Sequence, residues 1–457
     1  MLKINCRQLP KNGINRFLFK LGIVIIILSM LPALLMAAAD RSVTAAGAAD
    51  SQLKHQKESV KTPMKKIRIL LRDFRKVVKD GQVVNFNIGT TAHGPGAITV
   101  LEKFVPECEV IVWATAPLSE PMQRMMQRRF PEVKIVYGRL DEGTPAVEAA
   151  ARWCDLLLIG PGTGIAVHRD VEAFTRFCDK PYAAAGIGFA AKDVAKMRRS
   201  DFIFLRDTVA LAAAEKAELG VPTAFVPDGA FLFDAADDTG AAEFMRRHGL
   251  ENGKFVCCLP RYRYTPTWEF CPGETYPEDR IAYNKSMVRQ DMEPLVKAAC
   301  RVVREKGWKV LLSPETEPAI RLCKNELLSM FPADVKPFIV VPDHFWEADL
   351  ALGVYKQSRG LFGIEMHSQV MAVGNGIPAM VCRTKEFGSK SQMWVDIGLK
   401  DWLFDFDLPG DRERFPEAVM QMLNNEEDSA KQIKHAQSIL QERFEFFGNF
   451  MREHYGK

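Results

Sequence analysis

Short apolar segments alternate with amphipathic segments along most of the chain. Runs of four or five apolar residues, bounded by Gly, Pro or Asp, are typical of buried parallel strands. In the first half they lie at residues 67–71, 109–113, 133–137, 155–159, 182–186, 202–205 and 223–226. Between them, segments such as 119–129 and 208–219 have apolar residues at helical spacing. This alternation predicts a doubly wound α/β sheet.

The same pattern starts again after residues 244–253, which end a helical segment and contain two glycines. New apolar runs lie at 254–259, 308–312, 338–342, 360–364 and 378–382, and helical segments lie near 290–306, 316–330, 347–357 and 367–374. We therefore predict two Rossmann-like domains in tandem, at residues 67–250 and 251–425. Residues 426–457 are predicted to form a C-terminal helix that packs against either domain.

The N-terminal residues have a different character. Five basic residues and no acidic residue occupy positions 1–20, and residues 21–39 are uncharged and long enough to span a bilayer. Small residues follow Met36, as at a cleavage site, so residues 1–39 are predicted to be a signal peptide or a signal anchor. Residues 40–66 are rich in Ala, Ser and Lys and are predicted to be a flexible linker. The protein is then exported or membrane-anchored.

Two features favour the alternative, a cytoplasmic protein. Met64 stands directly before the first predicted strand and would serve as a translation start. The ten cysteines have no regular spacing and no Cys-x-x-Cys, which is typical of small buried hydrophobic residues and not of a secreted disulfide framework.

Composition excludes several classes of protein. With 457 residues, 47% hydrophobic and 26% charged, the chain is neither disordered nor collagen-like nor a polytopic membrane protein. The net charge of +4 offers no electrostatic case for binding nucleic acid. The eight histidines show no paired ligand spacing, so no metal site is predicted.

Ligands of open α/β sheets bind beyond the carboxyl ends of the strands, so candidate residues were sought there. Two glycine-rich turns follow strands, and their backbone N–H groups either bind an anion or belong to plain tight turns. The first lies at residues 87–96, before a helical pattern at 97–104, and the second lies at 160–164. Their candidate binding residues are Asn87, Gly89, Thr90, Gly162 and Gly164.

Charged side chains follow other predicted strands. Arg206 follows one strand and either projects into the cleft or forms a surface salt bridge, and Asp228 belongs to a turn or faces the cleft. Arg261 and Arg263 alternate with tyrosines, and they either hold a carboxylate or phosphate or form a cation–π cluster on the surface. Glu315 is interpreted as a carboxylate at the start of a helix.

The last candidates lie after the run at 360–364. His367 opens a helix there, and a histidine in this position either donates a proton near neutral pH or caps the helix by a hydrogen bond. Glu365 lies beside it, and Lys390 is a cation in the loop that follows the next strand.

Taken in order, these residues resemble the polysaccharide pyruvyl transferase family over residues 67–405. The early Asn-x-Gly-Asp turn of the family is similar to Asn87-Ile88-Gly89-Thr90, and its glycine turn to residues 160–164. Its Arg-Asp/Glu-x-x-Ser helix start and Asp-Pro-x-Phe turn are similar to residues 206–208 and 227–231. Its late Arg-x-His, Gly-x-Pro and lysine match Glu365-Met366-His367, Gly376-Ile377-Pro378 and Lys390.

The resemblance implies a fold of the glycosyltransferase-B type and a transferase. Its reaction moves a pyruvyl group from phosphoenolpyruvate to sugar hydroxyls of a cell-surface polysaccharide, with phosphoenolpyruvate as co-substrate and no further cofactor. His367 is then the acid or the group that orients the donor, and Arg206 holds an anionic group of the donor. Asn87, Gly89, Gly162 and Gly164 line the cleft.

Two residues depart from the family pattern. Glu365 replaces a donor-binding arginine, and a carboxylate beside a phosphate would repel it by about 1 kcal/mol or more. Thr90 replaces the usual Asp. Arg261 or Arg263 would supply the missing positive charge. A transferase of this fold with another donor, such as a nucleotide sugar, and a degenerate glycan-binding member are the alternative functions.

Overall fold

A computed structural model describes residues 65–74, 77–79, 82–269 and 277–457. The predicted signal segment and nearly all of the predicted linker lie outside these residues and stay predictions. Intact-mass and protease-accessibility analysis of the native protein would test them. Within the described ranges, no helix combines the length and the apolar character that crossing a membrane requires.

The first sheet is parallel and has the strand order β5-β4-β1-β6-β7-β8-β9. Its strands are β1 (Ile67–Arg72), β4 (Cys108–Ala114), β5 (Lys134–Tyr137), β6 (Leu156–Ile159), β7 (Tyr182–Ile187), β8 (Ile203–Leu205) and β9 (Thr223–Phe225). Its helices are α2 (Ile88–Phe104), α3 (Glu120–Arg129), α4 (Pro145–Trp153), α5 (His168–Phe177), α6 (Val194–Met197) and α7 (Thr208–Lys216). We call this part the N-terminal domain.

Helices cover both faces of this sheet. Ile69 and Leu71 of β1 belong to a core that includes residues of α2 and α3, whereas Leu70 belongs to a second core with residues of α4, α5 and α7. Successive side chains of a strand point to opposite faces, so the two cores lie on opposite sides of the sheet. The predicted doubly wound arrangement is confirmed for this domain.

The second sheet is also parallel, in the order β12-β11-β10-β13-β14-β15, and defines the C-terminal domain. Its strands are β10 (Phe255–Leu259), β11 (Lys309–Leu312), β12 (Ile339–Val340), β13 (Leu361–Gly363), β14 (Ala379–Arg383) and β15 (Leu403–Asp405). Its helices are α9 (Glu278–Lys306), α10 (Glu317–Arg321), the π-helix η5 (Leu322–Leu327), α11 (Leu328–Met330), α12 (Ala348–Tyr355), α13 (His367–Gly374), α14 (Gln392–Asp396) and α15 (Pro409–Asn424). The segments η3 (Gly229–Leu232) and α8 (Asp238–His248) connect the two sheets.

In both sheets the strand order reverses beside the first strand, at β1 with β6 and at β10 with β13. Such reversal points are where open α/β sheets bind ligands. Every predicted strand run overlaps a strand of the structure. The sequence did not indicate the edge strand β15 or the hairpin of β2 (Val77–Lys79) and β3 (Gln82–Val84), because only two or three consecutive apolar residues mark each of them.

The sequence predicted a turn at residues 87–96, but this prediction is wrong, because α2 already begins at Ile88. Asn87 is its N-cap, and its side-chain oxygen accepts hydrogen bonds from the N–H groups of Gly89 at 2.7 Å and Thr90 at 3.4 Å. The later glycines of this segment serve packing: a Cβ at Gly96 would overlap the backbone of Gly229 in η3. The glycines therefore permit a close helix contact and do not form a turn.

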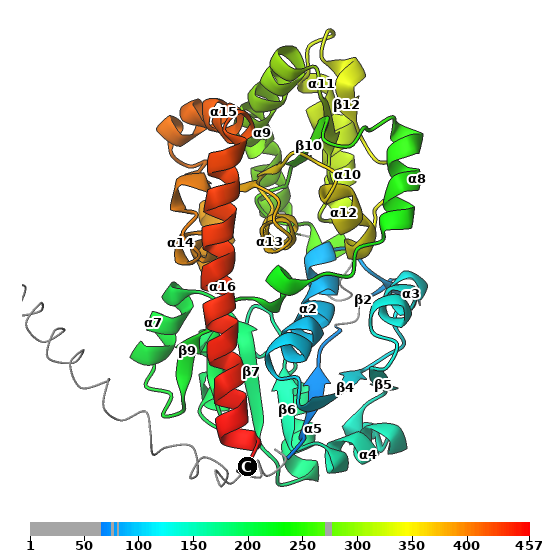
Figure 1. Cartoon of the computed structure of the whole chain (residues 1–457), viewed down its shortest axis with the longest axis vertical. Helices are drawn as coiled ribbons and strands as arrows, with labels where there is room; N and C mark the ends of the chain where they lie inside the picture. The colour runs from blue at the N-terminus through cyan, green and yellow to red at the C-terminus, as the bar shows by residue number, and fades with distance from the viewer. Residues whose placement is uncertain (1–64, 75–76, 80–81, 270–276) are drawn as a thin grey trace, which may run out of the picture. The chain divides into compact units, whose positions relative to one another are not determined.

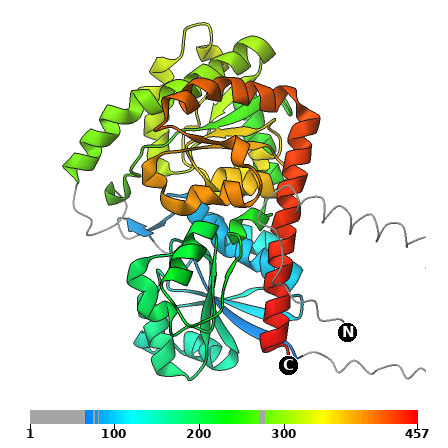
Figure 2. The ribbon, with the colours of Figure 1, turned by 90° about the vertical axis from the view of Figure 1, so that its left-hand side faces the viewer.

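The C-terminal helix α16 (Glu426–Tyr455) contacts both domains and not only one of them (Figures 1 and 2). Near its start, Gln437 donates a hydrogen bond to the carbonyl oxygen of Gly374, at 3.1 Å. Further along, the ring of Phe444 lies 5.6 Å from that of Phe104, and Phe450 lies 5.0 Å from Phe202. The helix therefore ties the two sheets together.

Candidate functional site

The start of α2 packs directly against the C-terminal domain. The N–H of Ile88 donates to the carbonyl oxygen of Glu315 at 3.0 Å, and the N–H of Glu317 donates to that of Phe86 at 2.9 Å. Asn87 and Thr316 form an antiparallel bridge between these segments. The predicted binding residues of the first motif thus lie against the loop that follows β11.

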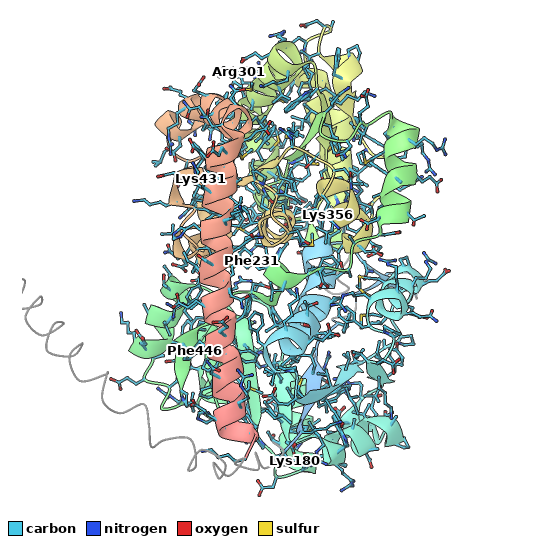
Figure 3. All side chains as sticks on the ribbon, in the orientation of Figure 1. Lys180, Phe231, Arg301, Lys356, Lys431 and Phe446 are labelled. Atoms are coloured by element: carbon cyan, nitrogen blue, oxygen red, sulfur yellow. The ribbon has the colours of Figure 1, made fainter. Side chains whose placement is uncertain are left out.

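A second contact joins the domains beside α13. A Cβ at Gly374 would overlap the carbonyl oxygen of Phe231, which Figure 3 labels, and Asn375 donates to the carbonyl oxygen of Phe233 at 2.9 Å. The helix that His367 opens is therefore held against η3 of the connecting segment.

His367 is oriented by Glu315, a buried carboxylate from the loop after β11. Its ring Nδ1 lies 3.3 Å from Oε1 of Glu315, and its backbone N–H donates to the same oxygen at 3.2 Å. The N–H of Ser368 donates to the other oxygen at 2.7 Å. Glu315 therefore caps α13 and not the helix that follows it in sequence, which corrects the sequence interpretation.

The pKa values follow from this arrangement. Burial by itself would raise the pKa of Glu315, but the hydrogen bonds from His367 and Ser368 lower it to about 2. Burial lowers the pKa of His367, although Glu315 opposes that effect. The charged carboxylate of Glu315 thus contacts Nδ1 of His367, and Nε2 of His367 faces His93 on α2.

Gly89 packs against the other side of the His367 ring. A Cβ at this position would overlap Nδ1 and Cγ of the ring and the Cβ of His367. Because Nδ1 is the atom that contacts Glu315, any side chain at Gly89 would displace the imidazole from its carboxylate. Gly89 therefore leaves the room that the His367 ring occupies.

A chain of polar contacts leads from His367 to the N-terminal domain. Nε2 of His367 lies 3.2 Å from Nε2 of His93 on α2, and that nitrogen lies 3.4 Å from Oδ2 of Asp228. Nη1 of Arg206, the residue after β8, lies 3.5 Å from the same oxygen. Arg206 and Asp228 are buried. The structure thus brings Arg206 and His367 to one place.

The charge of Asp228 is stabilised by its neighbours. Burial would raise its pKa, but His93, His367 and Arg206 together hold the pKa of this carboxyl well below its usual range. Its other oxygen accepts a hydrogen bond from the N–H of Ala230 at 3.0 Å, which caps η3. An ionised Asp228 therefore stands beside the two histidines.

Arg261, Glu365 and Lys390 form a second group, on the C-terminal domain side of Glu315. Nε of Arg261 lies 3.7 Å from Oε1 of Glu365. The cations of Arg261 and Lys390 lie 4.9 Å and 4.3 Å from the centre of the Phe387 ring. Nη1 of Arg261, Oε1 of Glu365 and Nε of Arg206 are buried and have no hydrogen-bond partner among the described residues. Polar atoms left in this way are available to a ligand.

Glu365 is not the repulsive charge that the sequence suggested. Burial and the neighbouring Glu315 raise its pKa to about 8, against the opposing effect of Arg261 and Lys390. Burial and Arg261 lower the pKa of Lys390 to about 7. Near neutral pH the carboxyl group of Glu365 therefore carries little negative charge and the amine of Lys390 is only partly protonated. Arg261 lies beside Glu365, the residue at the position where the family has its arginine.

The remaining predicted residues lie elsewhere or play supporting parts. Arg263 is buried in the C-terminal domain, where Asp291 accepts two hydrogen bonds at 2.8 Å and Asp407 accepts one at 2.6 Å. Gly162 accepts a hydrogen bond from the N–H of Gly188 at 2.7 Å, and Gly164 has a φ of +158°, which favours glycine. This loop supports the wall from which Arg206 projects, because a Cβ at Gly188 would lie 3.6 Å from Nη2 of Arg206.

His93 is the residue that the sequence analysis missed. Its only signal in the sequence is its place within the first glycine-rich motif, and it was not singled out there. Together the cluster offers cations on two walls, a histidine held by a carboxylate and a weakly charged carboxyl group. Such a set suits a small anionic ligand and the transfer of a proton.

Comparisons with known proteins identify the family and the fold. The family model described as Polysaccharide pyruvyl transferase matches residues 87–386, which is well over half of the chain and includes the residues of the cluster except Lys390. No curated protein sequence matches the chain.

Two solved structures share the fold. The S. aureus MnaA–UDP co-structure has a TM-score of 0.51 at 15% identity, over 84% of this chain and 96% of that chain. A Listeria monocytogenes protein described as a UDP-N-acetylglucosamine 2-epimerase has a TM-score of 0.50 at 14% identity, over 85% and 97%. At such identities the likeness concerns the fold alone, which is α/β with two parallel sheets and of the glycosyltransferase-B type.

Proposed function

Since the chain belongs to the polysaccharide pyruvyl transferase family, we propose that it transfers a pyruvyl group from phosphoenolpyruvate to two hydroxyls of a sugar in a cell-surface polysaccharide. The product is a cyclic ketal, and phosphate is released. The family indicates a transferase, and we propose phosphoenolpyruvate as the donor and the polysaccharide as the acceptor.

The observation that carries the proposal is the meeting of Arg206 and His367 around Asp228 and His93, with Arg261 and Lys390 beside them. Phosphoenolpyruvate carries a phosphate and a carboxylate, so its site needs cations on more than one side. Arg206 approaches from the N-terminal domain, and Arg261 and Lys390 approach from the C-terminal domain. The weak charge of Glu365 leaves this side of the cluster attractive to an anion.

The reaction then proceeds by proton transfer and two additions. His367 gives a proton to the methylene carbon of the donor, which becomes a methyl group and leaves an oxocarbenium-like centre at the adjacent carbon. One sugar hydroxyl forms a C–O bond there and loses its proton. The bond to the phosphate oxygen breaks, the second hydroxyl attacks the same carbon, and its proton leaves. Of the two hydroxyl protons, one balances the new methyl hydrogen and the other leaves with the phosphate.

The test uses the full-length protein in mild detergent with phosphoenolpyruvate and a panel of bacterial polysaccharides. We expect phosphate release that requires an acceptor, together with a new ketal methyl signal in the NMR spectrum of the glycan. Phosphoenolpyruvate is also expected to raise the Tm of the protein, since a ligand that binds only the folded state stabilises it. Stabilisation by nucleotide sugars, without any effect of phosphoenolpyruvate, would instead favour a different donor.

Gly89→Ala is expected to lower the rate of pyruvyl transfer about 100-fold, because a displacement of the His367 ring by about 1 Å has an effect of this size. Gly410→Ala is the matched control, since no atom lies within 4 Å of a Cβ at that position. Initial rates of phosphate release measure both variants. A Gly89→Ala protein as active as Gly410→Ala would contradict the role given to this contact.

A further inference from the structure

Three side chains from three separate elements direct ligand atoms to one point. They are His93 on α2, Asp228 before η3 and His367 at the start of α13, and their ligand atoms lie within 4.8 Å of one another. The sequence showed no metal-ligand spacing because these positions are far apart along the chain, and only the packing of α2 and α13 on η3 unites them.

Two of the three separations between the ligand atoms resemble those around a zinc ion. Zinc bonds to imidazole nitrogen and carboxylate oxygen are about 2.0–2.2 Å long, so tetrahedral ligands lie about 3.3–3.5 Å apart. Nε2 of His93 lies 3.2 Å from Nε2 of His367 and 3.4 Å from Oδ2 of Asp228. Two imidazoles and one carboxylate also form a ligand set that proteins use for transition metals.

Two further observations point to a cation at this place. Oδ2 of Asp228 is buried in a side chain with 0% exposure and makes no hydrogen bond of good geometry among the described residues; its charged neighbour is Nη1 of Arg206, 3.5 Å away. Glu315 contacts Nδ1 of His367, which places the proton on that nitrogen and turns the lone pair of Nε2 toward His93 and Asp228. Such a carboxylate behind a ligating histidine is a regular feature of metal sites.

We propose that His93, Asp228 and His367 bind one divalent transition-metal ion, for which Zn²⁺ is the reference ion. The proposal concerns binding and does not depend on the reaction proposed above.

The binding test uses the full-length protein in mild detergent, stripped with a chelator and then titrated with Co²⁺. We expect one equivalent to bind, with the visible absorption bands of tetrahedral cobalt and without the charge-transfer band of a thiolate ligand. Zn²⁺ should displace it. His93→Ala should lower the affinity at least about 100-fold, and Glu315→Gln should lower it about 10- to 100-fold.

The control variant is His168→Ala. His168 also lies beside a buried aspartate, with Nε2 3.0 Å from Oδ1 of Asp193, but no group of three metal-binding side chains includes it among the described residues. Its substitution should leave cobalt binding unchanged. His93→Gln is measured in parallel, since it keeps the volume of the buried side chain if the alanine variant folds poorly. Absence of stoichiometric binding, or binding that survives both His93 substitutions, would overturn the proposal.

The ion and a transferable proton cannot occupy Nε2 of His367 at the same time. If the proposed function is correct, one equivalent of Zn²⁺ should therefore inhibit pyruvyl transfer, and a chelator should restore it. This second result rests on the proposed function, whereas the cobalt titration stands without it. Inactive protein that still binds one Co²⁺ through His93 would contradict only the proposed function.

Discussion

His367→Asn is expected to lower the kcat of pyruvyl transfer about 10²- to 10⁴-fold, the usual contribution of a positioned acid. The imidazole of His367 lies where the two domains meet. Glu315 contacts its Nδ1, and its Nε2 remains for proton transfer. An asparagine keeps polar atoms near Glu315, but its amide does not act as an acid near neutral pH. The measurement is steady-state phosphate release with chelator present.

A division between kcat and KM distinguishes an acid from a purely structural residue. The KM for phosphoenolpyruvate should change little, because the cations of Arg206, Arg261 and Lys390 remain. His435→Asn on the exposed face of α16 is the control and should retain the parent rate. A His367→Asn protein within tenfold of the parent would show that another group supplies the proton.

Arg263→Ala is expected to lower the free energy of unfolding by about 3–5 kcal/mol, which is typical when one partner of a buried ion pair is removed. The side chain is 2% exposed and bridges Asp291 of α9 and Asp407 beyond β15, with Glu386 3.6 Å away. Without the guanidinium, these carboxylates would remain close together with no cation between them. Denaturation by urea, followed by circular dichroism, measures the change.

Arg301→Ala is the matched control for this change. Arg301, labelled in Figure 3, also contacts two carboxylates, of Glu305 and Glu417, but its side chain is 35% exposed. Exposed pairs of this kind contribute about 0–1 kcal/mol. If the two arginine variants lost similar free energy of unfolding, the buried ion pairs of Arg263 would not stabilise the fold more than exposed ion pairs do.

Much of the fold could be predicted because its signal is local. Each central strand is a short run that is apolar on both faces, and a parallel sheet covered by helices is the arrangement that buries such runs. The strands β2, β3 and β15 escaped because their apolar runs are only two or three residues long. The start of α2 was misplaced because the glycines of residues 87–96 suggested a turn, whereas they permit close packing on η3 and His367.

The candidate site could be predicted only in part. Arg206, Arg261, Glu365 and His367 were found because each follows a strand, and the ends of parallel strands gather at one edge. Arg263 follows a strand as well, but its side chain is directed into an ion-pair network. His93 lies within a helix and not at a strand end, so no rule about strand ends could select it.

The sequence by itself determined the two α/β domains, the family and the order of the motifs, because these depend on residue types at short spacing. Only the tertiary structure decided which charges meet. The contact of His93 with His367, the capping of α13 by Glu315 and the weak charge of Glu365 all depend on residues far apart in the chain. Burial and distance set the strength of electrostatic interactions, and both quantities exist only once the two domains have packed together.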